Sequence, residues 1–277
     1  MAKSIGLIGN FKGKVGNTVG YKLTASNNGQ TQGIRVYQPV VKNPKSAGQA
    51  EQRAKLLAVN ATYRALKMVI DRGNEGLPYG NKSRLAWLKG ALKANQMPWI
   101  KKGEMVTHPV GTLLAKGSLP GIQYTGDDSS VKIIATGLAQ GQKLTTVGGV
   151  SSALMSVYPS LKTGDQITFV FVSGGADALN AKVESIVLDT TSAVAVSNWE
   201  EDADALIVHG PDGCFAEAII VSREGDNGEH LRSTAELKIW SDKLNAAPYD
   251  AASKAAAIAS YRASAATNSD WAEESIQ

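Results

Sequence analysis

The sequence predicts an α+β protein that is mainly β, and three observations support this prediction. A glycine-rich N-terminal segment alternates apolar and polar residues around an Asn-Gly pair, as β-hairpins do. Two segments between residues 46 and 95 repeat apolar residues every three or four positions, as helices do. Short apolar runs separated by turn residues fill most of the remaining chain, which is typical of antiparallel sheets. We therefore expect an N-terminal β-hairpin and two helices, followed by an antiparallel β-sandwich and a C-terminal alanine-rich helix.

This interpretation divides the chain into four regions of different composition. They are a basic β-hairpin arm at 1–45, a basic helical hairpin and linker at 46–116, an antiparallel β-sandwich at 117–245, and an alanine-rich helix with an acidic tail at 246–277. Residues 246–266 include 11 alanines, so the last helix has good helix propensity but little apolar surface to bury.

The N-terminal arm is expected to fold as a hairpin over residues 12–42. Apolar residues at every second position predict a first strand over 15–23. Asn28-Gly29 predicts a type I′ turn because both residues tolerate positive φ, and a return strand follows. The arm carries cations and no acid, and a two-stranded ribbon of this kind can enter a groove of a nucleic acid.

Two helices are predicted after the arm. Ser46 is a suitable N-cap for the first, and Gly73 suits its C-terminal end. The apolar stripe of the first helix consists of Leu56, Val59, Tyr63, Leu66 and Ile70. The second helix is predicted over 82–95, with Leu85, Leu88 and Leu92 as its stripe and Trp87 as a packing residue. The pair is expected to form a helical hairpin that buries its stripes on each other or on a neighbouring copy.

The chain from residue 118 onward is predicted to be rich in strands. The predicted strands are 122–125, 131–136, 166–172, 182–188, 205–209, 215–222 and 234–240. Within 166–172, Ile167, Phe169 and Phe171 alternate with residues that are also mostly apolar. Because both faces are apolar, this strand is expected to be central and covered on both sides.

The charge of the chain is distributed unevenly. The 277 residues carry a net charge of +4. Residues 1–116 hold 19 lysines and arginines against 4 acids, a net of +15, whereas residues 117–277 hold 10 against 21, a net of −11. Three interpretations stay open: the basic half meets a nucleic acid or another polyanion, it meets the acidic half of a neighbouring copy, or the two halves neutralise each other within one molecule.

The candidate nucleic-acid-binding residues are the cations of the arm and of the two predicted helices. No base-reading motif accompanies them, so binding is expected to depend on phosphates and to be independent of sequence. The candidates are Lys12, Lys14, Lys22, Arg35, Lys42, Lys45, Arg53, Lys55, Arg64, Lys67, Arg72, Arg84, Lys89 and Lys93.

Motifs for catalytic or metal chemistry are missing from the sequence. The single cysteine, Cys214, excludes an intrachain disulfide framework and Cys-based zinc fingers, and we expect it to be a small buried residue. The glycine-rich start fails as a phosphate loop, because Ile8 stands where the first glycine belongs and Val15 follows Lys14. The three histidines lack metal-ligand spacing, and the acids at 200–204 are expected to be solvated. We therefore predict no catalytic, cofactor-binding or metal-binding residue.

Three N-terminal motifs occur in a characteristic order. They are G-K-V-G-N-T-V-G at 13–20, N-P-K at 43–45 and Q-A-E-Q-R at 49–53. This series resembles an uncharacterised bacterial and phage family whose pattern is a G-K-x-G-x-x-V-G hairpin, an N-P-[KR] turn and a Q-x-x-Q-R helix start. The resemblance extends over the first 125 residues and implies the same order of hairpin and helix. The family has no established activity, so the resemblance implies no function.

Together these observations predict a non-enzymatic structural protein that assembles with copies of itself and contacts nucleic acid through its basic half. A coat or virion-associated protein of a phage or virus fits best, because it needs β-rich contacts between subunits and an electropositive surface for phosphates. The expected partners are the chain itself and nucleic acid, without a cofactor or a membrane. Neither a signal peptide nor a transmembrane stretch of ~18 apolar residues is visible, so we expect a cytoplasmic protein on synthesis that enters a virion.

Two alternatives stay open at this point. The β-sandwich can serve as an adhesion or interaction module that binds a protein or a glycan. An enzyme whose catalytic residues meet only on folding is the other alternative, because such residues need not be neighbours in the sequence.

Overall fold

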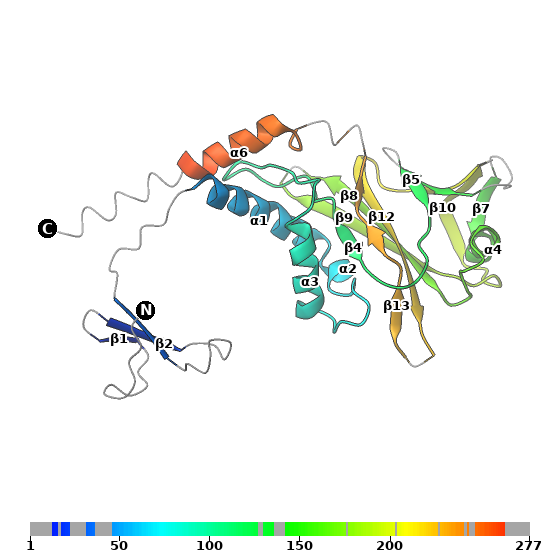
Figure 1. Ribbon diagram of the computed structural model, residues 1–277. Helices are drawn as coiled ribbons and strands as arrows, with labels where there is room; N and C mark the ends of the chain where they lie inside the picture. The colour runs from blue at the N-terminus through cyan, green and yellow to red at the C-terminus, as the bar shows by residue number, and fades with distance from the viewer. Residues whose placement is uncertain are drawn as a thin grey trace. The chain divides into compact units, whose positions relative to one another are not determined.

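The computed structural model divides the chain into two units, which we describe separately. One unit comprises residues 1–45 and 267–277, and the other comprises residues 46–266. Their elements confirm the predicted fold class, α+β and mainly β (Figure 1). The structure describes residues 13–15, 18–22, 32–36, 46–126, 130–135, 142–175, 177–202, 204–226, 228–240, 243 and 247–263.

The described part of the N-terminal unit is a three-stranded antiparallel sheet. Its strands, in the order β1-β2-β3, are β1 (Gly13–Val15), β2 (Thr18–Lys22) and β3 (Gln32–Val36). The pairing of β2 with β3 confirms the predicted hairpin. The single strand expected over 15–23 is wrong, because Val15 pairs with Thr18 and β1 runs antiparallel to β2. The predicted turn at Asn28-Gly29 lies outside the described residues.

Helix α1 (Ala47–Ala65) begins where its capping residue predicts. The Ser46 hydroxyl accepts a hydrogen bond from the Gln49 backbone N–H at 3.3 Å, which confirms Ser46 as the N-cap. The helix breaks at Leu66, and the short helix α2 (Lys67–Ile70) follows directly. Because the break is short, the two helices together cover most of the segment that the sequence predicts as one helix.

Most of the predicted stripe is confirmed, because Val59, Leu66 and Ile70 are at most 1% exposed, but the buried face of α1 also includes residues that the stripe left out. Ala50 and Ala54 are 4% and 0% exposed, whereas Leu56 is 40% exposed. The cause is helix α6 (Ala251–Ala263), which lies alongside α1 (Figure 1) and places Tyr261 against these alanines. Small side chains let two helices approach closely. The alanine-rich tail therefore has a partner, and the partner is α1.

Helix α3 (Asn81–Ala91) also buries a face that the leucine stripe did not predict. Ser83 and Trp87 are buried, while Leu85 is 48% exposed. The Ser83 hydroxyl donates to the Ile70 carbonyl at 2.8 Å, and this bond fixes the face that α3 turns inward. The packing role predicted for Trp87 is confirmed. Leu88 and Leu92 of the predicted stripe pack against the core that contains Leu66 and Ile70, whereas burial of the stripes on a neighbouring copy stays a prediction.

Two five-stranded antiparallel sheets form the β-rich region. One has the order β13-β12-β8-β9, with β15 paired to β12, and the other has the order β5-β6-β11-β10-β7. A separate two-stranded sheet joins β14 to β4. The bounds are β4 (Leu113–Ala115), β5 (Tyr124–Gly126), β6 (Ser130–Ile134), β7 (Gln142–Thr146), β8 (Gln166–Gly174), β9 (Leu179–Val187), β10 (Ala195–Asp202), β11 (Ala205–His209), β12 (Cys214–Glu224), β13 (His230–Arg232), β14 (Ala235–Glu236) and β15 (Lys238–Ile239).

Every strand predicted beyond residue 118 corresponds to at least one observed strand, but the structure contains several elements that were not predicted. The missed elements are β4, β7, β10, β13 and the helix α4 (Val147–Val157). Two glycines and three serines weaken the helical signal of α4. A side chain at Gly148 would lie 2.8 Å from the carbonyl oxygens of Thr190 and Ser192, so the helix start needs a glycine for this close approach.

The core lies on both sides of β8, which confirms the prediction of a central, covered strand. On one face, the ring of Phe169 meets that of Trp199 from β10 edge to face, with centroids 5.3 Å apart, which joins the two sheets. On the opposite face, Val170 and Val172 are fully buried. Helix α1 contacts the neighbouring strand β9, so helices cover this second face at one end of the sheet.

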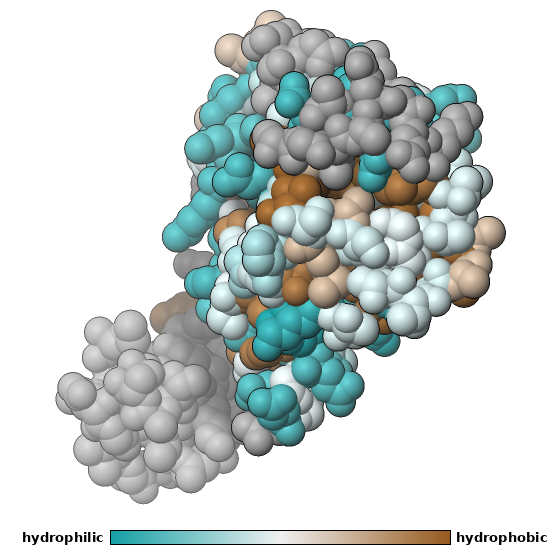
Figure 2. All heavy atoms as spheres, turned by 90° about the vertical axis from the view of Figure 1, so that its right-hand side faces the viewer, coloured by the Kyte–Doolittle hydropathy of each residue, from teal (hydrophilic) through white to brown (hydrophobic). Residues whose placement is uncertain are grey.

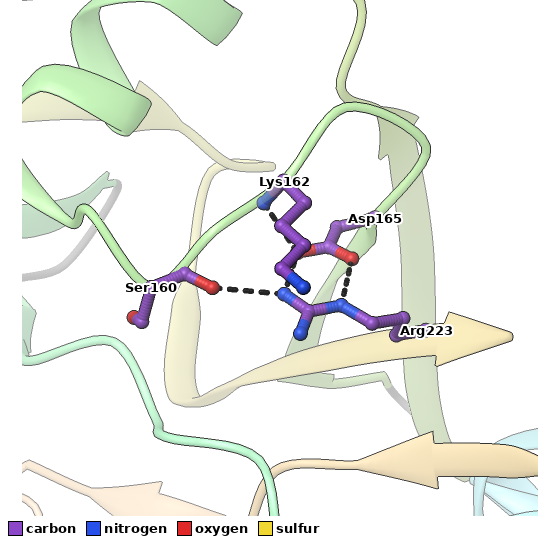
Figure 3. A network of polar contacts seen from close by, with 4 residues as sticks. All are labelled: Ser160, Lys162, Asp165 and Arg223. Atoms are coloured by element: carbon purple, nitrogen blue, oxygen red, sulfur yellow. Dashed lines mark hydrogen bonds and ion pairs between the residues drawn. The ribbon is translucent and has the colours of Figure 1, made fainter. Parts of the chain in front are cut away.

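A buried ion pair ties the turn before β8 to β12 (Figure 3). The Asp165 side chain is 1% exposed and accepts from Arg223 Nε at 2.6 Å and from Arg223 Nη2 at 2.7 Å. The backbone N–H of Lys162 donates to the same carboxylate at 2.8 Å, and Arg223 Nη2 also donates to the Ser160 carbonyl at 2.8 Å. Asp165 thus has three donors, and a carboxylate buried this deeply needs them.

His108 packs between two aromatic rings and makes the stability of the fold depend on pH. Its ring stacks on Phe215 at 5.1 Å and meets Tyr249 edge to face at 5.8 Å. Burial lowers the pKa of His108 below its ordinary value.

We expect the protein to lose stability between pH 7.5 and pH 5.5 because of His108. The unfolded chain takes up a proton at this histidine below about pH 6.5, whereas the folded chain resists it, so acid favours unfolding. Urea unfolding at the two pH values measures the difference, and the variant His108→Phe should show a smaller one. If His108→Phe lost as much stability between the two pH values as the wild type, the pH dependence would come from groups other than His108. Glu51 and Glu75, whose pKa values are lowered, titrate below this window.

Candidate nucleic-acid interface

The candidate cations of α1 and α2 form an exposed stripe. Arg53 and Arg64 are 11 residues apart, which is close to three helical turns, and both are exposed. Lys67 follows one turn later at the start of α2 and is exposed as well. None of the three forms an ion pair with an acid that the structure describes. Their charges therefore face solvent over the length of the helix.

Helix α3 adds a second set of exposed cations. Lys89 on α3 and Lys93, two residues beyond the end of α3, are exposed, as the sequence predicts for binding residues. Lys82 is also exposed on α3, seven residues before Lys89, and it was not among the predicted binding residues. Its spacing to Lys89 was the signal that could have identified it. We give the name helical basic face to the set of six exposed cations formed by these three lysines with Arg53, Arg64 and Lys67.

Two acids near the helical basic face are held in local ion pairs. Glu51 Oε1 lies 2.9 Å from Lys55 Nζ and 3.3 Å from Lys254 Nζ, which joins α1 to α6. The bond from Lys55 is the main cause that lowers the pKa of Glu51. Glu104 pairs with Lys101 at 3.4 Å, three residues away.

The remaining two acids of residues 46–116 accept hydrogen bonds from neighbouring groups. Asp71 accepts from the Tyr63 hydroxyl at 3.0 Å. Glu75 accepts from the backbone N–H groups of Ser118 and Arg232, each at 2.9 Å, and these bonds lower its pKa. The four acids of this region thus bond to groups other than the six cations of the helical basic face.

Three other candidate cations lie against aromatic rings. Lys55, besides its bond to Glu51, lies 5.9 Å from the ring centre of Trp99. Arg84 is half-buried and lies 4.5 Å from the ring centre of Tyr63. Lys55 and Arg84 therefore serve the packing of the helices. Arg72 is exposed and lies over a further ring, so it is both anchored and accessible.

The candidates of the N-terminal arm are placed only in part. Lys14 belongs to β1, Lys22 to β2 and Arg35 to β3. Lys14 pairs with Val19, and Val19 pairs with Arg35, so positions 14 and 35 flank the central strand in one row. Lys12, Lys42 and Lys45 lie outside the described residues.

The end of the larger unit that carries α4 has a different surface. Helix α4 contains no charged residue. Figure 2 looks onto this end and shows pale and brown residues at its centre, with teal residues toward the margins. Polyanions are held mainly through charge. The candidate interface therefore does not include the end that carries α4.

The residues considered for other chemistry have structural surroundings. Cys214 is 2% exposed and donates to the Val172 carbonyl at 3.3 Å, and burial raises the pKa of its thiol to about 11. This confirms the prediction of a small buried residue. The acids at 200–204 are not all solvated as expected, because Glu201 is 8% exposed and Glu200 lies 3.5 Å from His209. Within the described ranges, no three metal-ligating side chains converge.

Comparisons with protein families, with curated proteins and with solved structures returned no match for this chain. In the part of the chain that the structure describes, no helix combines the length and the apolar character needed to cross a bilayer.

Proposed function

We propose that this chain is a non-enzymatic structural protein that assembles with itself and binds nucleic acid, as a coat or virion-associated protein of a phage or virus does. The observation that carries the proposal is the helical basic face. Its six exposed cations lie outside every ion pair among the described residues, while the four acids of the same region are occupied elsewhere. A surface of this kind attracts a polyanion by releasing its condensed counterions.

Binding of this kind reads phosphates and not bases. The six residues of the helical basic face are lysines and arginines, and no base-reading motif accompanies them in the sequence. Phosphate contacts position a protein on a nucleic acid but carry no sequence information. The proposed binding is therefore independent of sequence.

Self-assembly is supported by the charge asymmetry of the chain. The basic half, with +15, and the acidic half, with −11, attract each other between copies as well as within one copy. Sizing the purified protein at low and high salt tests this part of the proposal. Large assemblies that shrink as salt rises are expected, and a monomer at every salt concentration would contradict self-assembly.

A salt titration tests the nucleic-acid part of the proposal. We expect the full chain to bind a labelled oligonucleotide of random sequence, as measured by fluorescence anisotropy. If six phosphates are neutralised, the affinity should fall by roughly 10³ between 50 and 200 mM salt. Absence of binding at low salt, or an affinity that does not change with salt, would overturn the proposal.

A second candidate function rests on a groove between β9 and β10. The groove has a volume of about 780 Å³ and is lined by Phe169 and Trp199 among others. Asn198 donates to Glu184 at 2.9 Å beside it, so the lining combines aromatic rings with polar groups. This favours the alternative of an interaction module that binds a protein or a glycan. A monodisperse monomer that binds no nucleic acid would support this alternative over the first.

A further inference from the structure

A pocket opens on the face of the first sheet where the helices no longer cover it. It has a volume of about 390 Å³ and lies between α2 and the strands β8, β9, β12 and β13. Further along the same face, Val170 and Val172 are buried. The sheet face thus changes from covered to open within one strand. The lining of the pocket combines polar side chains with the apolar residues Met68, Val69, Val183 and Ile220. We call this site the Arg72–Arg232 pocket after the two cations in its lining.

The strand register places polar side chains across the base of this pocket. Arg232 pairs with Ser222, and Ser222 pairs with Gln166, so these residues form one row. Thr168 and Ser185 pair in the next row, and their hydroxyl groups lie 3.2 Å apart. Hydroxyl, amide and guanidinium groups together are suitable partners for phosphate oxygens.

Both charged groups in the lining are arginines. Arg72 reaches the pocket from the residues after α2, and Arg232 Nη1 donates to Ser222 Oγ at 3.3 Å, which holds its guanidinium over the sheet. No carboxylate belongs to the lining. Glu75 bonds to the backbone N–H of Arg232 at 2.9 Å and lies outside the lining. The pocket therefore favours an anion, and two arginines suit a phosphate.

An exposed pair of aromatic rings lies beside the same arginines. Tyr79 is 48% exposed, and its ring centre lies 5.6 Å from that of His230. Arg72 lies over the Tyr79 ring at 5.6 Å. His230 is two residues before Arg232 on β13, so the two side chains leave the strand on the same face. Rings and cations are thus presented together.

We propose that the Arg72–Arg232 pocket binds one nucleotide of a single-stranded nucleic acid, with its phosphate at the two arginines and its base stacked on the Tyr79–His230 rings. This inference rests on the proposed function and adds the class of nucleic acid. A base within a duplex is already stacked and does not reach a protein ring, whereas a base of a single strand does. Lys67 of the helical basic face begins α2, and Arg72 of the pocket lies five residues further along the chain.

The test compares binding of a labelled oligothymidylate of about twenty nucleotides with binding of a duplex of the same length. Fluorescence anisotropy on the full chain gives both affinities. The single strand should bind more tightly. Tyr79→Leu should weaken single-strand binding by about tenfold and leave duplex binding unchanged. Arg232→Gln should weaken single-strand binding and reduce its salt slope by about 0.7.

The matched control is Arg262→Gln, because Arg262 is an exposed arginine on α6 outside the pocket. It should bind both probes as the wild type does, and circular dichroism and thermal unfolding should show all variants folded. If the wild type bound both probes with equal affinity, and Tyr79→Leu and Arg232→Gln bound them as the wild type does, the proposed nucleotide site would be overturned. The proposed function would stay intact in that case. A wild-type protein that binds neither probe would overturn both.

Discussion

Replacing Arg53, Arg64 and Lys67 together with glutamate is expected to lower the affinity for nucleic acid by at least about a hundredfold at 0.1 M salt. The three cations lie on one exposed stripe and form no ion pair with a described acid, so their charge is available to phosphates. Each lost phosphate contact removes about 0.9 from the slope of log affinity against log salt for a duplex, so the slope should fall by about 2.7. Glutamate has nearly the same helix propensity as arginine and lysine, so α1 should persist.

A second triple variant separates a local effect from a change in net charge. Lys101, Lys102 and Arg262 are exposed cations that the interface does not include. Replacing them with glutamate changes the net charge by the same amount and should reduce the affinity far less. If both triple variants lost affinity equally, binding would follow from the total charge and the helical basic face would have no special role.

Replacing Arg223 with methionine is expected to lower the free energy of unfolding by about 3–5 kcal/mol. The Asp165 carboxylate is 1% exposed and would keep only the Lys162 backbone N–H among its three donors (Figure 3). A buried carboxylate without its cation is unfavourable because it has lost both water and its counter-charge. Urea unfolding monitored by tryptophan fluorescence gives the value.

The double variant Arg223→Met with Asp165→Asn is the control for this second prediction. Asparagine carries no charge and can still accept from the Lys162 N–H, so part of the lost stability should return. A double variant less stable than Arg223→Met alone would show that the cost does not come from the isolated charge. A cost below about 1 kcal/mol for Arg223→Met would show that the pair contributes little to the fold.

The local parts of the fold could be predicted because their causes are local. The Ser46 cap depends on a hydroxyl group three residues from the N–H it binds, and β8 shows its two apolar faces in its own residues. The faces of α1 and α3 were predicted only in part, because apolar size alone does not decide which residues are buried. Leu56 and Leu85 stay exposed, since a close helix partner favours alanine and a hydroxyl–carbonyl bond orients Ser83 inward.

The candidate interface, like the helix faces, could be predicted only in part. The sequence shows which residues carry charge, and Arg53, Arg64, Lys67, Lys89 and Lys93 are exposed as a binding role requires. It does not show which charges are occupied. Lys55 pairs with Glu51 four residues before it on α1, a contact that helical spacing predicts. Lys55 also lies over the ring of Trp99, which is distant in the sequence, and helical spacing does not predict this second contact.

By its own pattern, the sequence determined the strands and helices with clear periodicity, the caps, and the division of charge between the two halves, because these depend on residue type and short spacing. Only the tertiary structure decided that α6 covers α1 and that Arg232 stands beside Arg72. These tertiary contacts join residues about 160 or more positions apart. They depend on how the sheets and helices pack as a whole and not on any local preference.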